Sequence, residues 1–205
     1  MNIAILGAGN VGSTLGKALS DAGHSVTYGL RNPLDPKYSS LVEHAKTTTI
    51  QKAVQEHTIV LLAVPWNAAE QTIQGLDWTD KILVDCTNPI TKDFSGVEVV
   101  NGLSGAERIA QWAAGAKVVK CFNQTGVENI KKPSYSAGKT VMFSAGDDEQ
   151  AVKTVVQLAS DIGFDAHAAG NLAFSKTLEQ WAWLWIHMAT KQQWGRNFSF
   201  SLLHR

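Results

Sequence analysis

The amino-acid sequence predicts an α/β protein built on a doubly wound parallel sheet. Short runs rich in β-branched residues recur along the chain, and segments with the apolar spacing of helices lie between them. The runs are apolar without alternation, which is typical of parallel strands covered on both faces. The strand candidates are Ile3–Leu6, Val26–Tyr28, Ile59–Val64, Ile82–Val84, Val118–Val119 and Val141–Phe143.

Helix signals fill the intervals in order. The first helix carries Val11, Leu15, Ala18 and Leu19 on one face and ends at Gly23. Asn67–Gln74, stopped by Gly75, is the second candidate, and Ser104 with Glu107 forms a capping box for the third. Asp147 with Gln150 predicts the start of a further helix that ends before Gly163. Asn32–Lys46, which contains Pro33 and Pro36, predicts a loop.

Length and composition limit the class of protein. The 205 residues predict a single domain, 1–205, and equal numbers of basic and acidic residues, 18 each, argue against nucleic acid as a partner. Met1 and Asn2 lead directly into the first strand, and no apolar stretch reaches the ~20 residues of a bilayer span, so we expect a cytoplasmic protein without membrane contact. Cys86 and Cys121 end apolar runs and are interpreted as structural. No cluster of His, Cys and carboxylates has metal-binding spacing.

A glycine-rich turn connects the first strand to the first helix. It reads Gly7, Ala8, Gly9, Asn10, Val11, Gly12, which is G-x-G-x-x-G in the strand-turn-helix context that makes this pattern informative. Gly7 allows a tight turn, Gly9 lets a pyrophosphate approach the backbone, and Gly12 lets the helix and strand pack closely. The anion would lie at the helix N-terminus. The motif therefore predicts a Rossmann NAD(P)-binding fold.

The end of the second strand favours NADP over NAD. NAD-binding proteins usually place Asp or Glu there to hold the ribose 2′-hydroxyl, whereas this chain has no carboxylate before Asp35. Arg31 offers a planar guanidinium suited to a 2′-phosphate, and Asn32 is a further donor. The alternative is a solvated surface arginine.

Three further strand ends are expected at the same crevice, because ligands of open α/β sheets bind outside the carboxyl ends of the strands. They supply Ala63, Val64, Pro65 and Trp66, then Asn88 and Pro89, then Asn123. Asn88 and Asn123 could hydrogen-bond the nicotinamide amide or a second substrate. The alternative is that these are ordinary strand-to-helix turns.

No catalytic residue is assigned, because no general acid is evident. Tyr135 and Lys139 have the Tyr-x-x-x-Lys spacing of short-chain dehydrogenases, but nearby proline and glycine residues make a helix there improbable. His24, His44 and His57 fall near element ends remote from the predicted crevice, and His167, His187 and His204 have no evident partner. Hydride transfer to a flavin or deazaflavin ring needs no such acid, since the proton can come from solvent.

With these residues in view, the chain resembles the family of deazaflavin (coenzyme F420)-dependent NADP oxidoreductases, and it is also similar to the cytosolic domain of six-transmembrane ferric reductases. The resemblance rests on Gly7–Gly16, Gly23–Val26, Arg31–Pro33, Leu62–Trp66, Asp85–Pro89, Ala116–Asn123, Val141–Asp147, Ile162–Phe164, Trp185–Ile186 and Phe198–Leu203. It implies NADPH on the glycine loop, the 2′-phosphate at Arg31, and a flat tricyclic acceptor over the nicotinamide. It also implies that Ala63, Val64, Pro65, Asn88 and Pro89 line the nicotinamide half.

The C-terminal part predicts a short helical extension, 171–205. Trp181, Leu184, Trp185 and Met188 share one helical face, while Trp183 and His187 lie on another, so we expect a buried helix that packs in the core, in a homodimer interface or against an aromatic acceptor. The acceptor stays open between deazaflavin, FMN and FAD. Two alternative functions are a nonenzymatic NADP(H) sensor and a reductase of a small carbonyl or imine, although the latter usually has a large helical domain after the Rossmann half.

Overall fold

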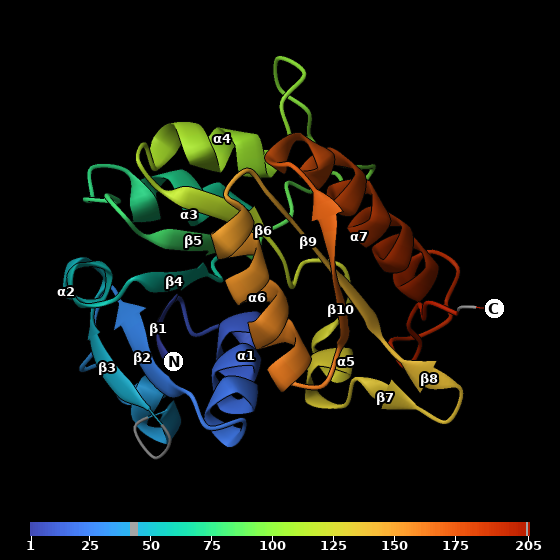
Figure 1. The fold of residues 1–205 in the computed structure, drawn as a ribbon, viewed down its shortest axis with the longest axis horizontal. Helices are drawn as coiled ribbons and strands as arrows, with labels where there is room; N and C mark the ends of the chain where they lie inside the picture. The colour runs from blue at the N-terminus through green and yellow to red at the C-terminus, as the bar shows by residue number, and fades with distance from the viewer. Residues whose placement is uncertain (42–44, 204) are drawn as a thin grey trace.

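The computed structural model describes residues 1–41, 45–203 and 205, and its centre is an eight-stranded sheet in the order β10-β9-β6-β5-β4-β1-β2-β3 (Figure 1). The strands of this sheet are β1 (Asn2–Leu6), β2 (Ser25–Leu30), β3 (Lys46–Thr49), β4 (Ile59–Leu62), β5 (Ile82–Asp85), β6 (Lys117–Lys120), β9 (Val141–Gly146) and β10 (Asp165–Gly170). A separate hairpin pairs β7 (Ser134–Tyr135) with β8 (Gly138–Lys139). The chain passes from β1 to β2 on one side and returns to β4 on the other, which makes the β1/β4 boundary the switch point of a doubly wound sheet. The predicted fold class is confirmed.

Helices cover both faces of the sheet. They are α1 (Asn10–Asp21), α2 (Ile50–Glu56), α3 (Trp66–Ile73), α4 (Gly105–Trp112), α5 (Val127–Lys131), α6 (Glu149–Asp161) and α7 (Ser175–Thr190), with 3₁₀ turns at Pro36–Leu41 and Leu172–Phe174. Ile3 and Ile5 of β1 pack in the core beneath α1, α5 and α6, whereas Ala4 and Leu6 pack in the core beneath α2, α3 and α4. Because successive side chains of a strand point to opposite faces, both faces of β1 are apolar, as its unbroken apolar run predicts.

The structure adds strands that the sequence patterns did not reveal. β3 is the polar stretch Lys46–Thr49 at the edge of the sheet, and β10 is the weakly apolar stretch Asp165–Gly170 at the other edge. Edge strands are covered less completely, so their sequences lack a continuous apolar run. The sheet is parallel except at one junction, where β9 runs antiparallel to β6.

The start of α6 and the buried face of α7 need correction. Asp148 caps α6, since its side chain accepts a hydrogen bond from Ala151 N, whereas Asp147 Oδ1 accepts from Leu172 N at 2.9 Å. The predicted C-terminal helix is present, but it is not buried all round: Leu184 is 48% exposed. Its buried apolar side chains are Leu178, Ala182, Trp185 and Ala189.

Two other sequence interpretations concern loops. Tyr135 and Lys139 lie on the two strands of a hairpin, so their spacing does not place them on one helical face. The predicted Asn32–Lys46 loop contains a 3₁₀ turn, and Lys46 begins β3. Residues 42–44 of this segment, and with them His44, lie outside the described residues, as does His204.

The capping box of α4 is confirmed and supports a stability prediction. Buried Ser104 accepts from Glu107 N, and the Glu107 carboxylate accepts from Ser104 N at 2.7 Å. We expect Ser104→Ala to lower the free energy of unfolding by about 1 kcal/mol, because the amide of Glu107 loses its partner. Urea denaturation measures this change. Ser160→Ala, on the exposed side of α6, is the control and should change stability by less than about 0.5 kcal/mol; equal losses in the two variants would contradict the capping argument.

Candidate functional site

The glycine loop forms a tight turn that opens the N-terminus of α1. Gly7 has φ +96°, and its N–H donates to Gly29 O at 3.2 Å, which ties the turn to β2. A Cβ on Gly12 would lie 2.2 Å from Gly7 O, so no side chain fits between the turn and the helix. Gly9 is the N-cap of α1 and has no side chain with which to occupy the first amides of the helix. A Cβ there would meet no atom of the described chain within 4 Å. The loop therefore presents unshielded amides to open space.

A pocket of about 310 Å³ lies in front of these amides, at the switch point of the sheet. Three segments that are far apart in the sequence line it: the start of α1, the turn after β4 and the turn after β5. The lining residues are Gly9, Asn10, Val11, Ala63, Val64, Pro65, Trp66, Cys86, Thr87 and Asn88. The structure thus brings together most of the residues expected at the crevice. Ala8 lies beside them and packs against the core beneath α1.

Arg31 and Asn32 are exposed and directly follow β2. β2 neighbours β1, so they stand on the adenosine side of a dinucleotide that crosses the glycine loop. Asn32 Oδ1 accepts from Leu34 N at 3.3 Å, and Asn32 O accepts from Asp35 N, which together turn the chain away from the strand end. Arg31 therefore stands at the start of a defined turn at the carboxyl edge of the sheet.

Asn88 and Asn123 bond to each other. Asn88 Nδ2 donates to Asn123 O at 2.8 Å, and Asn123 Nδ2 donates to Asn88 Oδ1 at 2.9 Å. Asn123 is buried and Pro89 is packed near Gly105, so of the three predicted residues Asn88 is the one that lines the pocket. The amide pair links the ends of β5 and β6 and leaves one lone pair of Asn88 Oδ1 for a ligand.

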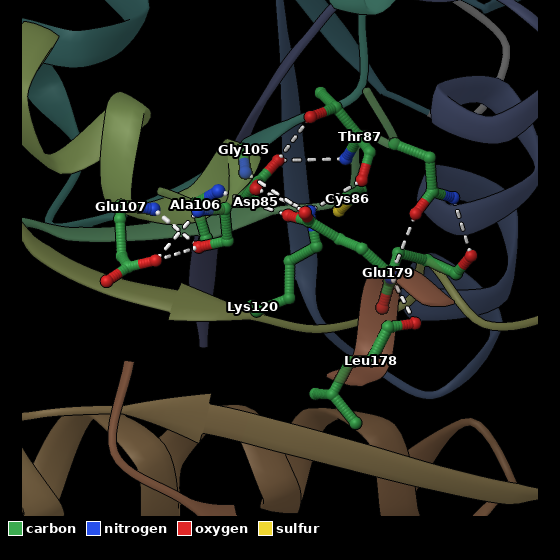
Figure 2. A network of polar contacts seen from close by, with 12 residues as sticks. Asp85, Cys86, Thr87, Gly105, Ala106, Glu107, Lys120, Leu178 and Glu179 are labelled. Carbon is green, nitrogen blue, oxygen red and sulfur yellow. Dashed lines mark hydrogen bonds and ion pairs between the residues drawn. The ribbon is translucent and has the colours of Figure 1, made fainter. Parts of the chain in front are cut away.

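A buried network of charges bonds to Thr87, one of the residues that line the pocket (Figure 2). Lys120 Nζ, at the end of β6, donates to Asp85 Oδ2 and to Thr87 O, both at 2.7 Å, and lies 2.9 Å from Glu179 Oε1. Asp85 Oδ1 accepts from Thr87 N and Thr87 Oγ1, at 2.9 and 2.7 Å. These bonds hold Thr87 in place, because its amide, its hydroxyl and its carbonyl are all engaged.

Glu179 connects this network to the C-terminal helix. Its carboxylate accepts from Gly105 N at 3.0 Å and from Ala106 N at 3.2 Å, at the N-terminus of α4. Lys120, Asp85 and Glu179 are completely buried. None of the three was predicted from the sequence. Asp85 and Lys120 carry a signal, since each is a charged residue inside or at the end of an apolar run, where an unpaired charge would be very costly. Glu179, between Leu178 and Gln180, carries none.

The cysteine in the pocket is not a ready nucleophile. Burial raises the pKa of the Cys86 thiol well above its usual range, and burial raises the pKa of Cys121 to about 12. Both are free and protonated at neutral pH. Of the described residues that line the pocket, Cys86 is the one with a titratable side chain, so the pocket wall presents no group suited to proton transfer at neutral pH.

Trp66 forms the outer wall of the pocket beside a paired arginine. Its indole N–H donates to Glu98 Oε2 at 3.0 Å, and the Arg108 guanidinium lies 4.9 Å from its ring centre. Arg108 also stacks over Trp112 and lies 3.6 Å from the Glu98 carboxylate. The charges of Glu98 and Arg108 balance each other, so this wall is aromatic and close to neutral.

A larger hollow of about 580 Å³ lies elsewhere. Its lining residues run along α1 from Ser13 to Asp21 and continue through Tyr28, Leu41 and Lys131. These residues stand away from the ends of β4 and β5. The smaller pocket is therefore the candidate site, because it combines the helix N-terminus with the switch point of the sheet.

Comparisons with known proteins agree with this geometry. Residues 2–89 match the family described as NADP oxidoreductase, coenzyme F420-dependent. The rat metalloreductase STEAP3 is 29% identical over 180 residues, which are 86% of this chain and 35% of that protein. The chain thus spans about a third of the length of this relative. Among the described residues, no helix is both long and apolar enough to cross a membrane.

Solved structures share the fold over nearly the whole chain. A structure described as that of an F420-dependent NADP reductase from Arthrobacter sp. FB24 is 27% identical, has a TM-score of 0.81, and covers 98% of this chain and 99% of its own. A reductive aminase from Aspergillus terreus, solved with NADPH, has a TM-score of 0.71 at 23% identity and covers 94% of this chain and 62% of its own. The resemblance expected from the sequence is thereby confirmed: over residues 2–89 the chain is similar to the F420-dependent NADP oxidoreductase family, and over nearly its whole length it has the fold of NADP-dependent reductases.

Proposed function

We propose that the chain is an NADPH-dependent oxidoreductase that passes a hydride between NADP(H) and a flavin-like or deazaflavin acceptor. The observation that carries the proposal is the unshielded N-terminus of α1 facing a pocket at the switch point of the sheet. The similarity to F420-dependent NADP oxidoreductases supports the same nucleotide and the same class of acceptor.

The residues present suit this dinucleotide. The amides at the start of α1 would hold the diphosphate, because the open space at Gly9 admits it and the helix dipole favours its charge. Arg31 would pair with the 2′-phosphate, and Asn32 would add a donor. Ala63, Val64 and Pro65, with Thr87 and Asn88, would then enclose the nicotinamide end.

The acceptor class follows from what the pocket wall offers. Bound NADPH supplies a hydride, which is equivalent to two electrons and one proton. A flavin-like ring that accepts this hydride takes up its second proton from solvent. The protein then acts by holding two flat rings together and excluding water. Trp66 provides an aromatic surface at the outer wall of the pocket, against which such a ring could stack.

Steady-state turnover tests the proposal. The purified chain is mixed with NADPH and, in turn, with FMN, FAD and a deazaflavin, and the loss of NADPH absorbance is followed. We expect catalytic oxidation of NADPH with at least one of these acceptors and much slower oxidation of NADH. Tight NADPH binding without turnover on any acceptor would favour the NADP(H) sensor instead, and turnover confined to imines or small carbonyls would favour a reductase of those substrates.

Several sequence predictions stay predictions. They are the single domain 1–205 with its extension 171–205, the small-molecule acceptor as partner, the homodimer, the exclusion of nucleic acid and of membranes, and the cytoplasmic location. Size-exclusion chromatography with light scattering tests the homodimer directly.

A further inference from the structure

The buried network of Asp85, Lys120 and Glu179 has one more negative charge than positive. Its hydrogen bonds are those of two carboxylates, since all four carboxylate oxygens accept from N–H or O–H donors: Asp85 from Thr87 and Lys120, Glu179 from Lys120, Gly105 and Ala106. Burial alone lowers the pKa of Lys120, but the two carboxylates outweigh burial and raise that pKa above its ordinary value. The ammonium is therefore charged at neutral pH, and the network carries a net charge of minus one.

The two carboxylates of the network differ in what stabilises them besides Lys120. Glu179 sits on the amides of Gly105 and Ala106, where the dipole of the eight-residue helix α4 supplies partial positive charge. Asp85 has no such helix N-terminus among its partners and bonds to Thr87, which lines the pocket, as well as to Lys120. The remaining charge thus lies directly behind the pocket wall, in an interior where water screens it little.

The neighbouring formal charges do not cancel the negative charge of the network. Glu98 and Arg108, beside Trp66, form a pair with no net charge. The partial positive charge of α1 acts at the glycine loop, where the diphosphate would lie. The Glu107 carboxylate, which bonds to Ser104 at the start of α4, is also negative and therefore does not offset the charge of the network.

The end of β5 is where the nicotinamide would lie. If the 2′-phosphate is at Arg31, beyond β2, a dinucleotide stretched over the glycine loop brings its other end to β4 and β5. The oxidised nicotinamide ring carries a positive charge, whereas the reduced ring is neutral. A fixed negative charge behind Thr87 therefore stabilises the oxidised form selectively.

We propose that the Asp85–Lys120–Glu179 network favours bound NADP⁺ over bound NADPH and so makes bound NADPH a stronger hydride donor. This inference rests on the proposed function, because it needs the dinucleotide in this pocket. The network acts through charge and through Thr87, so its members are positioning residues and not catalytic ones. We expect a preference of about tenfold, the size of effect that one partly screened charge produces.

The ratio of the dissociation constants of NADP⁺ and NADPH measures the effect. Wild-type protein should bind NADP⁺ more tightly than NADPH, and neutralising a carboxylate with Glu179→Gln or Asp85→Asn should shift the ratio toward NADPH by about tenfold. Glu149→Gln removes a negative charge from an exposed carboxylate on α6, paired with Lys153, and should leave the ratio unchanged. A purely structural role would lower the melting temperature without moving the ratio.

Adenosine 2′,5′-bisphosphate separates the possible failures, because it lacks the nicotinamide. If neither it nor NADPH binds the wild-type chain, the proposed function fails. If both bind, and the wild-type protein prefers NADPH or the ratio is the same in the folded variants, the charge proposal is overturned. If both variants fail to fold, the ratio of the NADP⁺ and NADPH dissociation constants in the wild-type protein still tests the proposal, because a preference for NADPH overturns it.

Discussion

Gly9→Asp is expected to abolish NADPH binding while leaving the fold intact. Gly9 has φ −72°, which any residue adopts, and a Cβ there meets open space, so the substitution causes no strain. As an N-cap, Asp accepts hydrogen bonds from the first amides of α1 and stabilises the helix dipole. The same carboxylate occupies the amides that the diphosphate needs and repels its charge. We expect an affinity loss of at least about 100-fold, since charge-assisted hydrogen bonds contribute about 1.5–3 kcal/mol each.

Fluorescence titration with NADPH, together with a thermal melt, tests this prediction. We expect no fluorescence change on addition of NADPH, together with an unchanged or slightly higher melting temperature. Gly12→Ala is the contrasting variant, because its Cβ would lie 2.2 Å from Gly7 O and would push α1 away from the turn. It should lose stability, by about 1–3 kcal/mol, together with affinity. Gly9→Asp that still binds NADPH tightly would show that the diphosphate does not lie on this helix.

The central part of the fold was predictable because burial on two faces leaves a clear pattern. β1, β4 and β5 lie in the middle of the sheet, and their sequences are continuous apolar runs. The edge strands β3 and β10 escape this pattern, since fewer neighbours cover them. The reversal of β9 was also hidden, because an apolar run has the same appearance in either direction.

The site was predictable where chemistry depends on the backbone. Glycine spacing indicates a turn that a diphosphate can approach, and strand order then determines which turns meet. Side-chain pairing is different, because it depends on residues that are distant in the sequence. Lys120 and Glu179 are 59 positions apart and meet only after α7 has packed on α4. The mutual bonding of Asn88 and Asn123 likewise required the structure.

Arg31→Ala is expected to weaken NADPH binding by about 10- to 100-fold and NADH binding hardly at all. Arg31 is exposed at the carboxyl end of β2, where its guanidinium can form two parallel hydrogen bonds with a 2′-phosphate. NADH has a hydroxyl in that place, so it loses no ionic contact. The expected factor corresponds to about 1.5–3 kcal/mol for hydrogen bonds between charged groups. Parallel titrations of each variant with both nucleotides measure the change in selectivity.

Two further variants separate specific pairing from general attraction. Arg31→Lys keeps the charge but loses the planar fork, so it should have an intermediate affinity for NADPH. Lys37→Ala removes a cation from the same exposed segment, but Lys37 is already paired with Asp35 at 2.8 Å and should contribute little. If Arg31→Ala lowered the affinities for NADPH and NADH equally, the guanidinium would not bind the 2′-phosphate specifically. The glycine loop could then still bind a dinucleotide, because the amides of α1 contact only the diphosphate that both nucleotides share.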